Sequence, residues 1–211
     1  MSTCMREINL KFDFDSLKDY VLEVQTVHKH RMWTVGNPNQ SLYTTQEMIK
    51  INQEIDAMCQ EGHTLEGLKK IHGWVLYGPL TNSNDIGPPY NSIRPRDKLS
   101  LQHTMLSYGE GKNLISNIPG LKRALLAKFD PGAILPLHSD NDNEAKIHVP
   151  ITSNDGCEFV LDDVSYKLLP GKAYYVDTTV PHTVFNHGKI ERTHLVIHFD
   201  KQYTEKVLEI K

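Results

Sequence analysis

Three residues in the C-terminal half of the chain have the types and spacing to hold a metal ion: His138, Asp140 and His182. Residues i and i+2 of an extended strand point to the same side, so His138 and Asp140 can present an imidazole nitrogen and a carboxylate oxygen to one point. The third ligand must come from elsewhere, and His182, at the start of a predicted strand, is the best candidate. Two histidines and one carboxylate form the facial triad of non-haem iron(II) oxygenases, which leaves positions open for a cosubstrate and dioxygen.

A fourth residue, Arg192, lies ten residues after His182 on the alternating stretch RTHLVIHF. The two-residue period of a strand places Arg192 on the same face as His194 and His198. An arginine that points into a β core is costly unless it meets an anion, and a dicarboxylate cosubstrate would supply one. The strand pattern alone slightly favours another interpretation, a surface ion pair between Arg192 and an acidic side chain. The HxD pair alone is also weak, because a chain with 11 histidines contains such pairs by chance.

The elements that would position these residues are predicted to be β-strands. From about residue 121 onward, short apolar stretches alternate with turn signals such as Asp130-Pro131-Gly132, a pattern typical of a β-sandwich or barrel. Strands are predicted at about 123–129, 146–151, 157–161, 164–168, 172–177, 182–186 and 192–199. We therefore expect a mainly β protein with flanking helices (α+β), whose core is a double-stranded β-helix, also called a cupin-like jelly roll.

The first 120 residues predict mainly helices that pack on this core. A strand could span Ile8–Phe12, and Asp15 or Ser16 could cap a helix. The apolar residues of this helix recur at helical spacing at Leu17, Tyr20, Val21, Val24 and Val27. Thr44 and Glu47 form a plausible capping box for a second helix. The apolar face of that helix would consist of Met48, Ile51, Ile55 and Met58.

Residues 78–98 are rich in Pro, Gly, Asn and Ser, which predicts a long flexible loop. Such a loop could close over a substrate as a lid, or it could be an irregular surface excursion. Its polar and aromatic residues include Asn82, Asn84, Tyr90, Arg94 and Arg96. Arg94 or Arg96 could meet a substrate carboxylate, although a solvated loop charge is the better interpretation of these two residues.

Length and composition limit the classes of function. The 211 residues suit a single domain over 1–211, with a mixed helical part at 1–120 and a catalytic core at 121–200. A net charge of -3 gives no reason to expect nucleic acid or an anionic membrane as a partner. The sequence shows neither an apolar run of about 18 residues nor the order of a signal peptide. Three widely spaced cysteines indicate neither a disulfide framework nor a zinc site, so we expect a cytoplasmic protein.

The segment from about Leu126 to Asp200 resembles the aspartyl/asparaginyl β-hydroxylase family of 2-oxoglutarate oxygenases, which includes some small free-proline hydroxylases. Four stretches occur in the order of that family: DPGAILPLHSD, KIHVPI, PGKAYYVDTTVPHTVFN and ERTHLVIHFD. The resemblance implies that His138, Asp140 and His182 bind iron(II). Some relatives have glycine in place of the ligand carboxylate, whereas this chain keeps Asp140, so we expect a complete triad.

The same resemblance implies how 2-oxoglutarate would bind. Arg192 would hold its distal carboxylate, helped by His148 in KIHVPI. Lys146 stands where an arginine is common in the family, and strand alternation places it on the face of His148. Ala127 occupies a position where some members have a cosubstrate-binding serine, so one hydroxyl contact is missing. Tyr175 or His148 could replace that contact.

We therefore expect an iron(II)- and 2-oxoglutarate-dependent dioxygenase that hydroxylates an amino acid, either free or as Asp, Asn or Pro in a peptide. Such an enzyme converts 2-oxoglutarate and O₂ to succinate and CO₂. The rival is a non-oxygenase cupin, either a metal-dependent isomerase or a small-molecule binding module. Glu144, six residues after His138, partly matches the first cupin metal motif, but that motif requires histidine at position 140. A non-catalytic jelly roll is a third possibility, against which the complete triad and Arg192 argue.

Overall fold

The computed structural model describes residues 4–34, 65–80, 100–140 and 143–210, together with the single positions 46, 49, 52, 53 and 56. The predicted capping box at Thr44 and Glu47 and most of the predicted loop, from residue 81 onward, lie outside the described residues. Residues 78–80, with which the loop was expected to begin, belong instead to a long strand, β3 (Ile71–Leu80). The prediction is wrong there because β3 continues through Gly78 and Pro79, which pair with Gln102 and Leu101 on the neighbouring strand.

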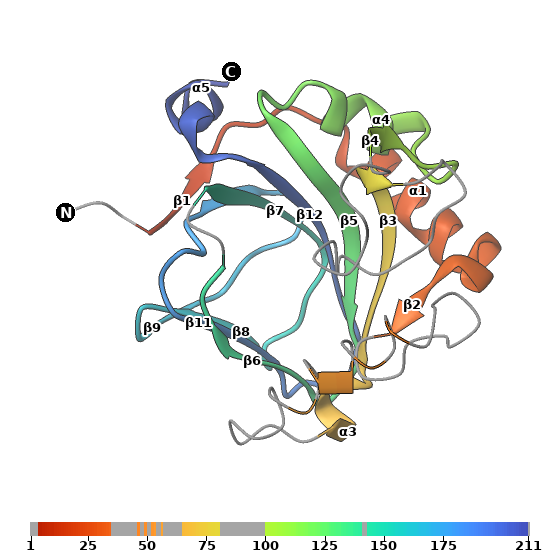
Figure 1. The fold of residues 1–211 in the computed structure, drawn as a ribbon, viewed down its shortest axis with the longest axis vertical. Coiled ribbons are helices and arrows are strands. Elements are labelled where there is room, and N and C mark those ends of the chain that lie inside the picture. Colours follow the sequence, from red (N-terminus) through yellow and green to blue (C-terminus); the bar gives the residue numbers. More distant parts are fainter. Residues whose placement is uncertain are drawn as a thin grey trace.

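Two antiparallel β-sheets face each other across the interior of the molecule (Figure 1). The larger sheet has eight strands in the order β1-β10-β7-β12-β5-β3-β2, and β4 pairs with β3. Besides β3, its strands are β1 (Met5–Ile8), β2 (Trp33–Thr34), β4 (Ser100–His103), β5 (Leu121–Phe129), β7 (Glu144–Thr152), β10 (Ala173–Val176) and β12 (Arg192–Asp200). The smaller sheet has the order β6-β11-β8-β9. Its strands are β6 (Ala133–His138), β8 (Cys157–Leu161), β9 (Val164–Tyr166) and β11 (His182–Asn186). The predicted mainly β fold with flanking helices and a cupin-like jelly-roll core is confirmed.

The described helices are α1 (Phe14–Val27), α3 (Leu65–Leu68), α4 (Gly109–Ser116) and α5 (Thr204–Leu208), with short 3₁₀ turns at Lys29–Arg31 and Lys201–Tyr203. Helices α1 and α4 cover the outer face of the larger sheet, whereas α3 lies near β6 (Figure 1). The N-cap of α1 is Asp13, which accepts a hydrogen bond from the Ser16 backbone N–H at 3.1 Å. The helix therefore begins earlier than the predicted cap, and β1 (Met5–Ile8) shares only Ile8 with the predicted strand Ile8–Phe12. Among the described residues, no helix is long and apolar enough to cross a membrane.

Strand alternation gives the larger sheet two different faces. On β12, the buried side chains of Leu195, Ile197 and Phe199 pack in the outer core with α1 and α4. The intervening residues of β12 face the smaller sheet and include, as predicted, Arg192, His194, Val196 and His198. A run of buried polar side chains on the other face of β12 thus lines the space between the sheets.

Candidate metal centre and its polar lining

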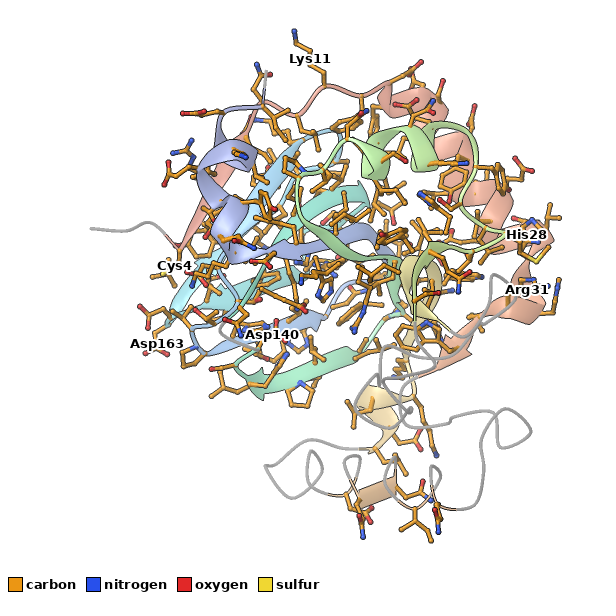
Figure 2. The ribbon with its side chains drawn as sticks, turned by 45° about the horizontal axis from the view of Figure 1, so that its top comes forward. Cys4, Lys11, His28, Arg31, Asp140 and Asp163 are labelled. Atoms are coloured by element: carbon orange, nitrogen blue, oxygen red, sulfur yellow. The ribbon has the colours of Figure 1, made fainter. Side chains whose placement is uncertain are left out.

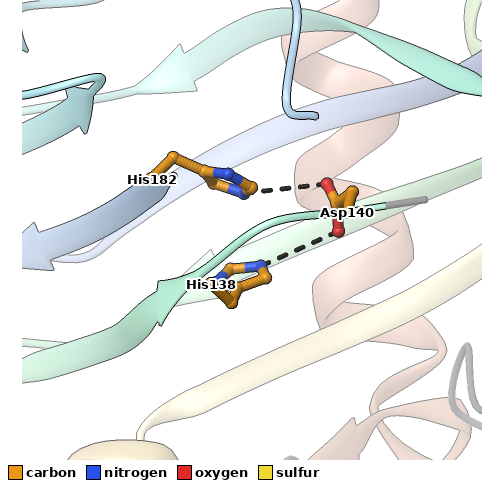
Figure 3. Close-up of side chains that lie close together, drawn as sticks. All are labelled: His138, Asp140 and His182. Atoms are coloured by element: carbon orange, nitrogen blue, oxygen red, sulfur yellow. Dashed lines mark ion pairs between the residues drawn. The ribbon is translucent and has the colours of Figure 1, made fainter. Parts of the chain in front are cut away.

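The two histidines of the predicted metal site are neighbours on adjacent strands. β6 ends at His138 and β11 begins at His182, and the two residues are direct partners in the antiparallel pairing. Their ring centroids lie 4.2 Å apart. Asp140 follows β6 by two residues, and both rings point toward its carboxylate (Figure 3). The structure thus brings together the three residues that the sequence pattern selected.

The distances within this cluster suit one bound metal ion. His138 Nε2 lies 3.8 Å from Asp140 Oδ1, and His182 Nε2 lies 3.6 Å from Asp140 Oδ2. One candidate ligand atom from each residue falls within 4.8 Å of the others. Ligands about 2.1 Å from a metal ion and at right angles to one another would lie about 3 Å apart. A small inward movement of the side chains would therefore place all three atoms on one ion.

Both histidines are held in the tautomer that a metal ligand needs. His138 Nδ1–H donates to the carbonyl oxygen of Pro136 at 2.6 Å, and His182 Nδ1–H donates to that of Val180 at 3.0 Å. In a neutral ring with this hydrogen bond, Nε2 carries the lone pair, and Nε2 is the atom that faces Asp140. Burial, and then the proximity of His138, lowers the pKa of His182 to about 4. His182 is consequently neutral at pH 7, which metal binding requires.

Asp140 is fixed as an anion beside these rings. Its backbone N–H donates to the carbonyl oxygen of Thr178 at 2.9 Å. Burial alone would raise the pKa of the Asp140 carboxyl, but the ion pair with Lys146 on β7 outweighs it and holds the pKa well below its usual range. Figure 2 shows Asp140 on the side of the molecule away from the C-terminal end of α1, where His28 is labelled. Two imidazoles and one carboxylate form the donor set of a divalent metal site with open positions.

Arg192 lies in the interior, at the other end of the polar lining. Its side chain is buried, and its guanidinium lies 5.0 Å from the centre of the Phe129 ring. Burial lowers the pKa of Arg192 to about 10, so the group stays charged at neutral pH. Among the residues that the structure describes, no acidic side chain pairs with it. The interpretation of Arg192 as half of a surface ion pair is therefore wrong.

His148 and His194 lie beside Arg192. An Arg192 guanidinium nitrogen donates to His194 Nδ1 at 3.0 Å. His148 Nδ1 lies 3.4 Å from this Nδ1 atom of His194. As predicted, His148 and Lys146 share the inner face of β7, although they contact different groups. His194 is the cross-strand partner of Ala127 on β5. The sequence placed His194 on the face of Arg192 but gave no sign that it contacts this arginine.

Two further polar contacts differ from what the sequence suggested. Tyr175 packs in the outer core, so it cannot replace a missing contact at Ala127 in the interior. Glu144 at the start of β7 pairs with His198, with Oε2 and Nδ1 3.2 Å apart. In the described part of the chain, Glu144 is therefore not a member of the metal-binding cluster. The partial match of Glu144 to a cupin metal motif is therefore not accompanied by a position in the cluster of His138, Asp140 and His182.

Several solved cupin structures are similar to part of this chain. A predicted oxalate decarboxylase of Thermotoga maritima is 17% identical with a TM-score of 0.33, and the match covers 38% of this chain and 68% of that protein. A Cupin 2 conserved barrel domain protein of Salinispora arenicola is 18% identical with a TM-score of 0.33, over 40% and 68% of the two chains. A cupin domain of Bordetella pertussis is 21% identical with a TM-score of 0.32, over 39% and 92%. A search of curated proteins gives no match.

A sequence-family comparison matches residues 97–202, just over half of the chain, to the family described as aspartyl/asparaginyl beta-hydroxylase. The matched segment runs from the residues before β4 to the turn after β12. It contains all six residues selected from the sequence for metal and cosubstrate binding: His138, Asp140, Lys146, His148, His182 and Arg192.

Proposed function

This chain belongs to the aspartyl/asparaginyl β-hydroxylase family, and we propose that it is an iron(II)- and 2-oxoglutarate-dependent dioxygenase. Its substrate is an amino acid, either free or as Asp, Asn or Pro in a peptide. When bound, the iron and 2-oxoglutarate supply the oxidising chemistry, in which one atom of O₂ enters the substrate and the other enters succinate as CO₂ is released. The protein contributes the binding and orientation of these groups.

One observation carries this proposal beyond a general metal site. Arg192 is a buried cation without an acidic partner among the described residues, and it lies in the same interior as the His138, Asp140 and His182 cluster. A buried charge of this kind is costly unless an anion meets it. A guanidinium binds a carboxylate through two parallel hydrogen bonds, so a dicarboxylate could bind the metal at one end and Arg192 at the other.

The residues around the metal site have distinct roles in this proposal. His138, Asp140 and His182 would hold the ion, because their Nε2 and carboxylate atoms converge while the Nδ1 atom of each histidine donates to a backbone carbonyl oxygen. Lys146 keeps Asp140 ionised through their ion pair. The ring of Phe159 stacks on that of His182 at a centroid distance of 5.9 Å and shields this side of the site from water.

Succinate formation tests the proposal. Purified protein supplied with iron(II), ascorbate, 2-oxoglutarate and O₂ should form succinate, and a panel of free amino acids and short peptides should reveal the substrate by stimulating the reaction. His182→Ala should abolish this activity. Full turnover in that variant would show that the assignment of ligands is wrong. A folded wild-type protein that binds a divalent metal but forms no succinate with any member of the panel would favour the non-oxygenase cupin.

A further inference from the structure

The hydrogen bonds around Arg192 fix the protonation of His194. A guanidinium can only donate, so His194 Nδ1 must accept the 3.0 Å hydrogen bond from Arg192. Burial, and then Arg192 and His148, lowers the pKa of His194 well below its ordinary value, so the ring is neutral. A neutral imidazole that accepts through Nδ1 carries its proton on Nε2. His194 therefore has an N–H donor on the side of the ring away from the acceptor nitrogen.

The same reasoning applies to His148. Its Nδ1 lies 3.4 Å from the acceptor nitrogen of His194, and this contact is attractive only if His148 Nδ1 carries a proton. Burial, and then Arg192, lowers the pKa of His148 well below its ordinary value, so its Nε2 carries a lone pair. A lone pair repels a carboxylate. His148 is therefore unsuited to donate a hydrogen bond to an anion beside Arg192.

The Nε2 atoms of His194 and His148 both lack a hydrogen-bond partner within the described part of the chain, although both atoms are buried. A buried donor without an acceptor costs free energy, which a ligand can recover by accepting its hydrogen bond. Arg192 and His194 also line one cavity of about 10 Å³, which has room for one water-sized group. Ala127, opposite His194, contributes no polar side-chain atom.

We propose that His194 is a cosubstrate-binding residue, which donates its Nε2–H to the distal carboxylate of 2-oxoglutarate beside Arg192. His148 is a positioning residue, which holds His194 in this tautomer and does not bind that carboxylate. This inference rests on the proposed function, because it concerns the same cosubstrate. It changes the division of roles implied by the family resemblance, in which His148 helps Arg192 directly.

Two substitutions of His194 separate the donor from the rest of the side chain. His194→Gln keeps an N–H near the position of Nε2, whereas His194→Asn keeps an acceptor near Nδ1 and leaves nothing near Nε2. Each variant would be loaded with Mn(II) and titrated by calorimetry, without O₂, with 2-oxoglutarate and with 2-oxopentanoate. The second ligand has the same metal-binding end but lacks the distal carboxylate. Thermal unfolding midpoints would verify that both variants fold.

The proposal predicts an effect on one ligand only. His194→Asn should bind 2-oxoglutarate at least about tenfold more weakly than the wild type, with unchanged affinity for 2-oxopentanoate. His194→Gln should stay within about threefold of the wild type for both ligands. Unchanged 2-oxoglutarate affinity in His194→Asn would overturn the inference, and so would an equal loss for both ligands. A wild-type protein that binds 2-oxoglutarate no better than 2-oxopentanoate would instead contradict the proposed function.

Variants of His148 test the positioning role with the same two ligands. His148→Asn can still donate to His194 Nδ1 through its side-chain amide, so 2-oxoglutarate affinity should be nearly that of the wild type. His148→Leu cannot donate and should lose affinity for 2-oxoglutarate severalfold while it keeps that for 2-oxopentanoate. Equal losses of 2-oxoglutarate affinity in the Asn and Leu variants would show that His148 itself binds the ligand.

Discussion

The two ends of the polar interior differ in how their charges are balanced. Near the metal cluster, the Asp140 carboxylate forms an ion pair with Lys146, and the Glu144 carboxylate accepts a hydrogen bond from the neutral ring of His198. Within the described residues, the side chain of Arg192 contacts His194, which is neutral, and the ring of Phe129. At the metal-binding end, the chain itself therefore supplies the counter-charge of Asp140. The second end needs an anion from outside, which identifies it as the part of the site that a ligand completes.

Loss of a histidine ligand should have the largest effect, because it removes one of three metal-binding groups. Replacement of a group that merely orients a ligand typically weakens metal binding by about 10- to 100-fold, so His182→Ala should weaken it by more than about 100-fold. Equilibrium titration with Mn(II) measures this effect. The matched control is His187→Ala, since His187 is exposed and lies on the turn after β11. Similar affinities in the two variants would contradict the assignment of His182.

Lys146→Met tests the charge balance at the metal-binding end of the interior. This substitution keeps most of the side-chain volume but leaves Asp140 without its counter-charge, so the ligand-free protein should lose about 3 kcal/mol of unfolding free energy. Urea denaturation without metal measures this quantity. A variant as stable as the wild type would show that the Lys146–Asp140 pair does not balance this end.

Arg192→Met should act in the opposite direction. It removes a buried charge that has no acidic partner among the described residues, so the ligand-free protein should gain about 2 kcal/mol of unfolding free energy. In the wild type, saturating 2-oxoglutarate with Mn(II) should raise stability beyond the effect of Mn(II) alone, and the variant should lose this additional gain. If Lys146→Met and Arg192→Met were destabilised to the same extent, the proposed difference in charge balance between the two ends of the interior would be wrong.

Acid should destabilise the ligand-free protein through its buried neutral histidines. Burial, and then Lys146, lowers the pKa of His198 to about 4, whereas the unfolded chain binds this proton near pH 6.5. Between these values the unfolded state binds more protons, so stability falls as pH falls. One such histidine accounts for about 1 kcal/mol between pH 6.5 and 5.5. Urea denaturation at these two pH values should show a smaller fall in His198→Gln, and an equal fall would contradict the role of His198.

The strands could be predicted because their patterns are local. Predicted strands 157–161 and 182–186 match β8 and β11 residue for residue, since alternation and turn residues mark both ends. β6 was missed because its sequence AILPLH does not alternate and contains Pro136. A proline is tolerated there because β6 lies at the edge of the smaller sheet.

The site could be predicted only in part, for a related reason. The HxD spacing, His182 and the face of Arg192 follow from short-range patterns in the sequence. The contact of His194 with Arg192 and the position of Ala127 opposite His194 depend on side-chain conformation and on the register between β12 and β5. A single sequence shows neither. The ion pair between Lys146 and Asp140 could not be predicted for the same reason, because it joins strand β7 of the larger sheet to the segment that follows β6 of the smaller sheet.

The central claim is that one interior holds both a metal ion and a dicarboxylate, and a visible spectrum tests it most directly. Wild-type protein without O₂ should develop a weak charge-transfer absorption band when 2-oxoglutarate is added after iron(II), because chelation of iron by the keto acid produces such a band. The band should saturate with one equivalent of each. Arg192→Met should require much more 2-oxoglutarate to develop it. A folded, iron-loaded wild-type protein that shows no band on addition of 2-oxoglutarate would contradict the account.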